Sequence, residues 1–127
     1  MQVYILTKDG VKVDEYEPDI FVVLEVGRAL NLPEYMMQKE VRRVSAIKAL
    51  SPNEIPEVAK RLYDLVSKIP LDKKIALVVS GPLALTGLFF AFQGIHRTIC
   101  LGQFNPSKGD YDWFLIEPSQ LRNFFLV

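Results

Sequence analysis

The chain has 127 residues, half of them apolar, which suits one compact domain over residues 1–127 and leaves too little length for a second domain. Basic and acidic residues both number 15, so no overall field attracts a large nucleic acid or an anionic membrane surface. One cysteine and one histidine exclude an internal disulfide and a structural zinc site, and no apolar stretch reaches membrane-spanning length. We therefore expect a soluble, unprocessed, cytoplasmic protein without a metal or cofactor.

The first quarter of the chain predicts a hairpin followed by a helix. Residues 2–6 and 11–16 are rich in strand-forming residues, and Asp9 and Gly10 between them have the chemistry of a tight turn. Residues 17–32 open with a helix-starting Pro-Asp pair and carry apolar residues at helical spacing. We therefore predict a helix there, although its valine-rich centre also suits a strand.

The middle of the chain predicts a short strand and a helix. In a strand over residues 41–47, Arg42 and Arg43 would face opposite ways, which favours a solvated surface over a ligand site. The sequence "SPNE" at 51–54 is a capping-box pattern with a proline at the first helical position. It predicts a helix that begins there and ends near Ser67.

The remaining residues alternate between strand and helix patterns. We expect strands at 75–80, 98–104 and 111–117, a helix over 82–95 and a turn at 105–110. This alternation predicts an α/β fold with a mainly parallel sheet flanked by helices and an antiparallel strand pair at each end.

The junction "VVSGPLAL" is a candidate anion site. Gly81 follows Ser80 where a buried strand meets a helix, and the free N–H groups of Leu83 and Ala84 would point at a ligand together with the positive end of the helix dipole. Ligands in such sheets bind beyond the carboxyl ends of the strands. The alternative is a plain strand-to-helix turn, because the pattern lacks the glycines and lysine of the known phosphate loops.

His96, the only histidine, follows the same helix. It could serve as an acid, a base or a donor to phosphate, or it could be a surface residue at a helix end. A helix of this length places it about 20 Å from Ser80, so one copy of the chain cannot easily bring both to the same phosphate.

Two further segments are candidates for binding. In "FNPSKGDY", Asn105 could contact a base or ribose, and Ser107 and Lys108 could contact a phosphate, but a hairpin turn uses the same residue types. The apolar tail at 124–127 should dock on its own domain or bury against a second subunit.

Residues 77–111, "LVVSGPLALTGLFFAFQGIHRTICLGQFNPSKGDY", resemble the core of the small CRISPR-associated ring nucleases and their CARF- and SAVED-type relatives. In that family a strand ending in Ser-Gly leads through an apolar helix to a histidine, and the next strand ends in an aromatic residue, an Asp-Pro pair and a glycine-containing turn. The resemblance implies a CARF-like Rossmannoid homodimer that binds cyclic oligoadenylate across its interface in type III CRISPR antiviral defence.

The resemblance also implies residue roles. Ser80 and Gly81 would contact phosphate or ribose, and His96 would correspond to the histidine of the family. Asn105 stands where the family has aspartate, which puts metal-assisted cleavage in doubt because an amide is neither an anionic ligand nor a base. The leading hypothesis is a metal-independent ring nuclease with His96 and Lys108 as catalytic residues. The alternatives are a non-catalytic cyclic-oligoadenylate sensor and a structural or oligomerisation domain.

Overall fold

The computed structural model describes residues 1–46, 48–94 and 96–117, which form an α/β fold with one seven-stranded mixed sheet. The strands are β1 (Gln2–Thr7), β2 (Gly10–Glu15), β3 (Ile20–Val26), β4 (Glu40–Ala46), β5 (Ile75–Val79), β6 (Ile99–Asn105) and β7 (Asp110–Ile116). The helices are α1 (Glu34–Met37), α2 (Ile55–Ser67) and α3 (Leu83–Gln93). None of the helices in these ranges is long and apolar enough to cross a membrane.

The strand order is β2-β1-β7-β6-β5-β3-β4, and most neighbouring strands run parallel, as predicted. The predicted antiparallel pair at each end is wrong for one end. The β1–β2 hairpin is terminal, but β6 and β7 lie inside the sheet and the other outer strand, β4, is parallel to β3. The reason is that β1 adds to β7 in parallel, with Tyr4 opposite Phe114, so both antiparallel pairs lie in the same half of the sheet.

The helix predicted over 17–32 is wrong, because this segment forms β3 near the middle of the sheet. Strands β4 and β5 pair with β3 on either side, and both faces of β3 are covered. Val22 and Leu24 pack into the core on one face, whereas Phe21 and Val23 pack into the core on the other. Burial on both faces demands a continuous apolar run, and such a run also matches helical spacing by chance.

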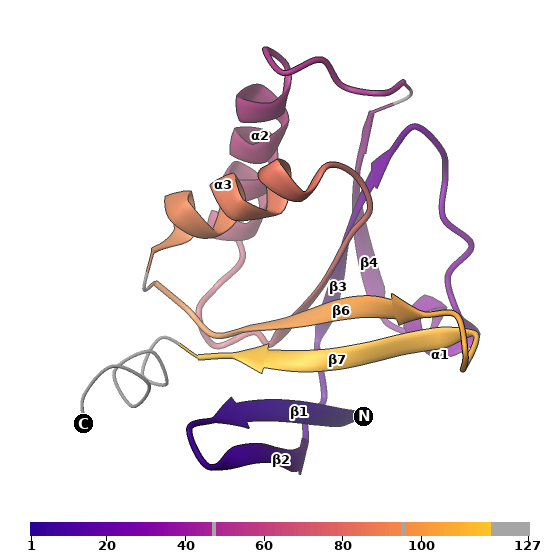
Figure 1. The fold of residues 1–127 in the computed structure, drawn as a ribbon, viewed down its shortest axis with the longest axis vertical. Helices are drawn as coiled ribbons and strands as arrows, with labels where there is room; N and C mark the ends of the chain where they lie inside the picture. Colours follow the sequence, from indigo (N-terminus) through magenta and orange to yellow (C-terminus); the bar gives the residue numbers. More distant parts are fainter. Residues whose placement is uncertain (47, 95, 118–127) are drawn as a thin grey trace.

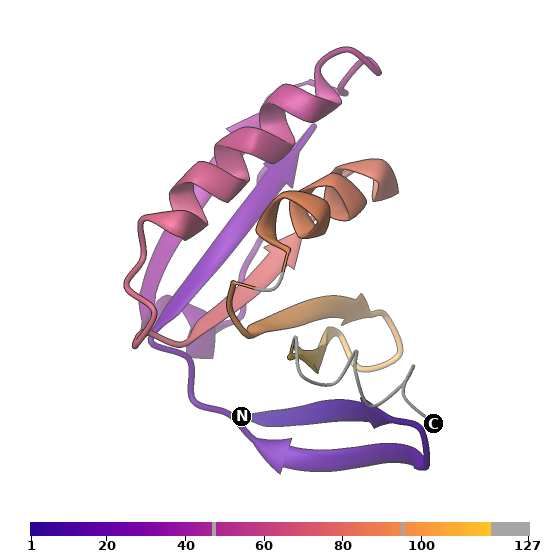
Figure 2. The ribbon, with the colours of Figure 1, turned by 90° about the vertical axis from the view of Figure 1, so that its left-hand side faces the viewer.

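Both long helices cover the same face of the sheet, as Figures 1 and 2 show. Buried apolar residues of α2 and α3 pack there against β3 and β5, and they include Val58, Leu62, Val66, Leu85 and Phe89. The short α1 lies on the opposite face, where its Met36 is buried beside Phe21 and Trp113. Helix α2 begins at Ile55 and the predicted capping box is half formed: Oε1 of Glu54 accepts from the Ser51 N–H, as in a capping box, but the Glu54 N–H donates to the Ser51 carbonyl instead of the Ser51 hydroxyl.

Buried Arg97 ties the loop after α2 to the end of the sheet where the parallel strands begin. Its guanidinium donates hydrogen bonds to four backbone carbonyls, those of Val66 (3.3 Å), Ile69 (2.7 Å), Pro70 (3.0 Å) and Lys73 (2.7 Å). These carbonyls lie at the end of α2 and in the loop that enters β5. One charged side chain thereby satisfies backbone groups that no helix or strand ladder reaches.

The connections after β3 and β5 leave the sheet on opposite faces. The segment after β3 crosses the face that carries α1 to reach β4, whereas the segment after β5 crosses the other face through α3 to reach β6. Because β3 and β5 are neighbours, their two connections diverge at the carboxyl ends of the strands and leave a crevice between the connections. In open α/β sheets this topological switch point is where ligands bind.

Candidate functional site

A cleft of about 660 Å³ opens at this switch point. Its lining comes from four segments: residues 28–31 after β3, residues 78–81 at the end of β5 together with Leu83 and Thr86 of α3, residues 101–104 at the end of β6, and Tyr111 of β7. We call it the switch-point cleft. Its volume lies in the usual range for small-molecule sites, roughly 300–1,000 Å³.

The first wall of the switch-point cleft is the strand-to-helix turn. Gly81 has a φ of +149°, and a Cβ atom at this position would lie 2.8 Å from Cγ2 of Val26. The turn therefore requires glycine. The N–H groups of Leu83 and Ala84, in the first turn of α3, have no hydrogen-bond acceptor among the described residues, and that first turn carries no acidic residue. Such N–H groups occur at the start of every helix and can bind an anion, so the prediction that Leu83 and Ala84 contact one stays a prediction.

The second wall is the loop after β3, which a buried carboxylate holds in place. Glu25 accepts hydrogen bonds from the Leu30 N–H (2.5 Å), from Arg43 Nη1 (2.8 Å) and from the Ser45 hydroxyl (3.0 Å). Burial alone would raise the pKa of Glu25, but these hydrogen bonds outweigh it and lower the pKa. The same loop carries Arg28, which is exposed, lines the cleft and has no ion-pair partner among the described residues.

The third wall is aromatic. The rings of Phe104 and Tyr111 meet edge to face with their centroids 5.5 Å apart, and Tyr111 packs in turn on Trp113 at 5.6 Å. Gly102 makes this packing possible, because a Cβ atom there would lie 2.6 Å from Cζ3 of Trp113. Tyr111 is almost fully buried, whereas 53% of the Phe104 surface is exposed.

The charges of the lining favour an anion. Arg28 is the only charged residue in it, and no carboxylate lines the cleft among the described residues, although the chain has 15 acidic side chains. The polar groups around Arg28 are neutral: they belong to Asn31, Ser80, Thr86 and Gln103. The arrangement can hold a ligand that has a small negative charge at one end and an apolar ring at the other.

Three of the predicted binding residues, Ser80, Gly81 and Leu83, line this cleft, and Ala84 follows them in α3. The other predicted binding residues, Asn105 and Ser107, do not line it. Asn105 donates from Nδ2 to Oδ2 of Asp112 (2.9 Å) and accepts the Ser107 N–H at Oδ1 (3.0 Å), so its amide organises the β6–β7 turn. These contacts support the hairpin-turn interpretation.

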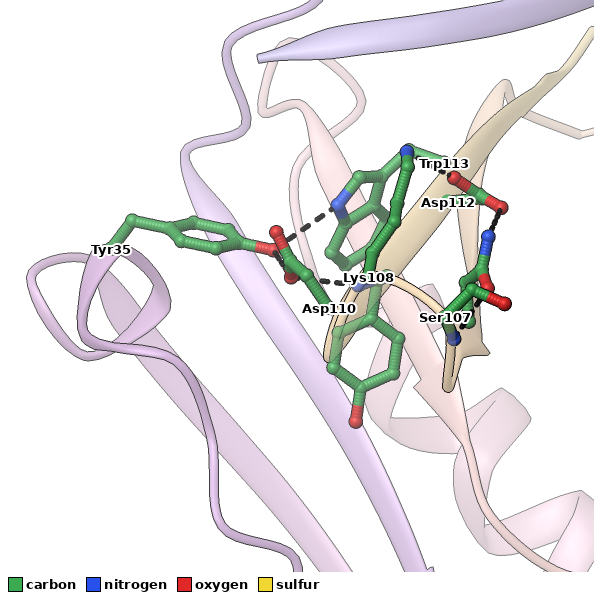
Figure 3. Close-up of polar contacts among 8 residues, drawn as sticks. Tyr35, Ser107, Lys108, Asp110, Asp112 and Trp113 are labelled. Carbon is green, nitrogen blue, oxygen red and sulfur yellow. Dashed lines mark hydrogen bonds and ion pairs between the residues drawn. The ribbon is translucent and has the colours of Figure 1, made fainter.

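Lys108, predicted as catalytic, belongs to the same turn. Its Nζ lies 2.6 Å from Oδ1 of Asp112, and this hydrogen bond raises the pKa of Lys108. Lys108 lines a separate hollow of about 420 Å³ together with Asp110 and Tyr35. Tyr35 reaches across from α1 and donates to Oδ1 of Asp110 at 2.8 Å (Figure 3). Tyr111 is shared by the two hollows and separates the Lys108 side from the switch-point cleft.

His96, the other predicted catalytic residue, lies at the opposite edge of the sheet. It follows α3 and precedes β6, so it is beside the amino ends of the parallel strands, whereas Ser80 is beside their carboxyl ends. It is exposed and lines neither hollow. The structure does not bring His96, Lys108 and Ser80 together within one copy of the chain. The apolar tail at 124–127 lies outside the described residues.

Arg28, Phe104 and Tyr111 line the cleft but were not predicted as site residues. Arg28 fell within the segment expected to be helical. Had β3 been predicted, the residues that follow it would have been placed beside Ser80, because parallel strands bring their carboxyl ends to one edge. Phe104 immediately precedes Asn105, and only the contacts within the turn show which of these two neighbours faces the cleft.

Comparisons of the chain with protein-family models, with curated proteins and with solved structures found no match. Within residues 1–46, 48–94 and 96–117, no cluster of three or more histidine, cysteine, aspartate or glutamate side chains could hold a metal ion. The interpretation of the site therefore depends on its own geometry.

Proposed function

We propose that this protein binds a nucleotide phosphodiester in the switch-point cleft and acts as a binding module of CARF-like Rossmannoid type. The observation that carries the proposal is the composition of the cleft: one guanidinium, free helix N–H groups and aromatic rings around a crevice whose described lining has no carboxylate. A nucleotide needs these three kinds of partner, two for its phosphate and one for its base.

The charge of the cleft favours a phosphodiester over a nucleoside triphosphate. Arg28 and the N–H groups of Leu83 and Ala84 match one negative charge well. A triphosphate carries several more charges, and such ligands usually bring Mg²⁺, which proteins hold through carboxylates. The charge match thus selects a ligand with a single charge at each phosphate.

Cyclic oligoadenylate has this charge pattern, and the resemblance of residues 77–111 to the ring nucleases points to the same ligand. One cleft of this volume would take only a part of such a ring. Two clefts in a homodimer would take equivalent parts of a symmetric ring and would double the number of cations that face it. We therefore propose a homodimer that senses this messenger in type III CRISPR signalling.

The positions of the residues favour binding over cleavage. Ring cleavage needs the attacking 2′-hydroxyl held in line with its phosphate, next to groups that take and give a proton. His96 lies at the far edge of the sheet, and Lys108 is paired with Asp112 outside the cleft. The sensor hypothesis is therefore preferred to the ring-nuclease hypothesis.

Titration calorimetry of the chain with cyclic tetra-adenylate and cyclic hexa-adenylate tests the proposal, and chromatography of the recovered ligand tests for cleavage. We expect one of the two to bind and to be recovered intact. Arg28→Ala should weaken binding at least about 10-fold, since a hydrogen-bonded charge contributes roughly 1.5–3 kcal/mol. Arg61→Ala is the matched control, because Arg61 is an exposed arginine of α2 that does not line the cleft.

If neither ring binds, the proposed function is wrong. If a ring binds and is converted to a linear product, the ring-nuclease hypothesis replaces the sensor hypothesis. Equal affinity of Arg28→Ala and Arg61→Ala for a ring that does bind would place the ligand outside the switch-point cleft.

A further inference from the structure

We infer that Phe104 is the residue on which a base of the ligand stacks, so that the switch-point cleft selects nucleotides by an aromatic contact as well as by charge. The inference rests on the proposed function and deepens it. It makes Phe104 a specificity-determining residue and assigns the two ends of the nucleotide to opposite walls of the cleft.

The exposure of Phe104 is the first observation. Its neighbour across the ladder, Tyr111, is 9% exposed and Trp113 is 4% exposed, whereas Phe104 leaves 53% of its surface in contact with solvent. Single exposed apolar side chains are common on protein surfaces, but Phe104 lines the cleft, and small-molecule sites are lined mainly by apolar and aromatic side chains. Its position therefore suits a flat ring that enters the cleft from solvent.

The support behind Phe104 is the second observation. A row of aromatic rings runs from Phe104 through Tyr111 and Trp113 to Phe21, with successive centroids 5.5, 5.6 and 5.7 Å apart. Tyr111 meets Phe104 edge to face, so it holds the ring from one side. A ring that its neighbours already hold loses little conformational entropy when a base stacks on it.

The position of Phe104 relative to the cation is the third observation. Phe104 is the second-to-last residue of β6, whereas Arg28 follows β3, and β5 with its Ser80-Gly81 turn lies between these two strands in the sheet. A phosphate at the turn would lie near Arg28, and the attached base would extend toward Phe104. The carboxamides of Asn31 and Gln103 also line the cleft, and an amide matches the paired donor and acceptor of adenine at N6 and N7.

Asn105, the residue predicted to contact a base, is occupied elsewhere. Both atoms of its amide group form hydrogen bonds within the β6–β7 turn, one to Asp112 and one from the Ser107 N–H. Its immediate neighbour, Phe104, faces the cleft instead. The inference therefore moves the predicted base contact from Asn105 to its neighbour Phe104.

The experiment compares Phe104→Ala with Phe104→Trp in calorimetric titrations with whichever of cyclic tetra-adenylate and cyclic hexa-adenylate binds the unaltered chain. Stacking of a base on an aromatic side chain contributes about 1–3 kcal/mol, so Phe104→Ala should weaken binding by roughly 5- to 150-fold. Phe104→Trp retains a ring and should bind within about 3-fold of the unaltered chain. Leu71→Ala is the matched control, because Leu71 is an apolar side chain, 75% exposed, that does not line the cleft.

A second readout separates stacking from a general disturbance of the cleft. The dependence of affinity on salt reports phosphate contacts, so Phe104→Ala should keep the salt dependence of the unaltered chain, whereas Arg28→Ala should reduce it. Binding of Phe104→Ala with unchanged affinity overturns the inference and leaves the proposed function standing. Failure of the unaltered chain to bind either ring overturns both the inference and the proposed function.

Discussion

Two glycines, six residues apart, should respond to alanine with opposite signs. At Gly81 the φ of +149° is unfavourable for alanine, and the new Cβ atom would lie 2.8 Å from Cγ2 of Val26. Backbone strain of this kind costs about 1–3 kcal/mol, and the displacement of a packed neighbour costs a similar amount. We expect Gly81→Ala to lower the free energy of unfolding by about 3 kcal/mol.

Gly87 lies within α3, and a Cβ atom there would meet nothing within 4 Å. Alanine is preferred to glycine in a helix interior, so Gly87→Ala should raise the free energy of unfolding by roughly 0.5–1 kcal/mol. Each kcal/mol shifts the melting temperature of a domain of this size by about 3–4 °C. We therefore expect Gly81→Ala to melt about 10 °C lower and Gly87→Ala about 3 °C higher than the unaltered chain.

The assay is urea and thermal unfolding followed by circular dichroism and by fluorescence of Trp113, the only tryptophan. Trp113 is buried beside the cleft, so its emission reports loss of the fold. A Gly81→Ala protein as stable as the unaltered chain would refute the geometry assigned to the strand-to-helix turn. A loss of stability in Gly87→Ala would refute the open environment assigned to that helix position.

Three further residues give predictions about the fold. Arg97→Met should lower the free energy of unfolding by about 3 kcal/mol, because the charged hydrogen bonds to four backbone carbonyls are lost. The measurement is urea unfolding, and an unchanged urea midpoint would contradict the stabilising role of Arg97. Ionised Glu25 should stabilise the fold above pH 4.5, its ordinary pKa, and lose this effect as the pH falls, since its pKa is lowered in the folded state. At pH 7 the Glu25→Gln variant should accordingly be less stable than the unaltered chain, and it should lose less stability as the pH falls. Parallel plots of stability against pH for the two proteins would contradict the lowered pKa of Glu25. Burial raises the pKa of the Cys100 thiol to about 12, so a thiol reagent at pH 8 should label Cys100 only after the protein unfolds. Rapid labelling of the native protein would contradict the burial of this thiol.

Elements set by local chemistry could be predicted from the sequence. The pair Asp9-Gly10 indicated the first hairpin, although its two turn residues are Lys8 and Asp9 and Gly10 begins β2. The strands and helices between residues 75 and 117 agree with the structure to within about two residues at most ends. In these segments the apolar spacing and the turn residues favour the same structure. Strand β3 could not be assigned in this way, because its character comes from the two strands that flank it and from cores on both faces.

The place of β1 in the sheet also depends on distant residues. Nothing in its own sequence indicates a parallel neighbour, and its pairing with β7 joins residues more than 100 positions apart. The hairpin was therefore predicted correctly as a unit, but its position next to β7 follows from tertiary packing alone. That position decides which strands lie inside the sheet.

The candidate site likewise has residues that local sequence predicts and residues that only distant contacts place. Ser80 and Gly81 could be predicted because a glycine between a buried strand and a helix has a local signature. Asn105, Ser107 and Lys108 were ambiguous, because turns and phosphate sites use the same residue types, and only their contacts with Asp112 and with each other support the turn. Arg28 could not be predicted, because it lines the same cleft as Ser80 and Gly81 only since β3 and β5 are neighbours in the sheet.

The most direct test is a pair of backbone amide NMR titrations of the chain, one with cyclic tetra-adenylate and one with cyclic hexa-adenylate. We predict that the ring that binds causes its largest shifts at Gly81, Leu83, Ala84 and Arg28, since the proposed phosphate position is between the helix N-terminus and the guanidinium, and that the amide signal of His96 stays unchanged. Shifts confined to the 105–110 turn or to the region of His96, or no shifts with either ring, would contradict this prediction.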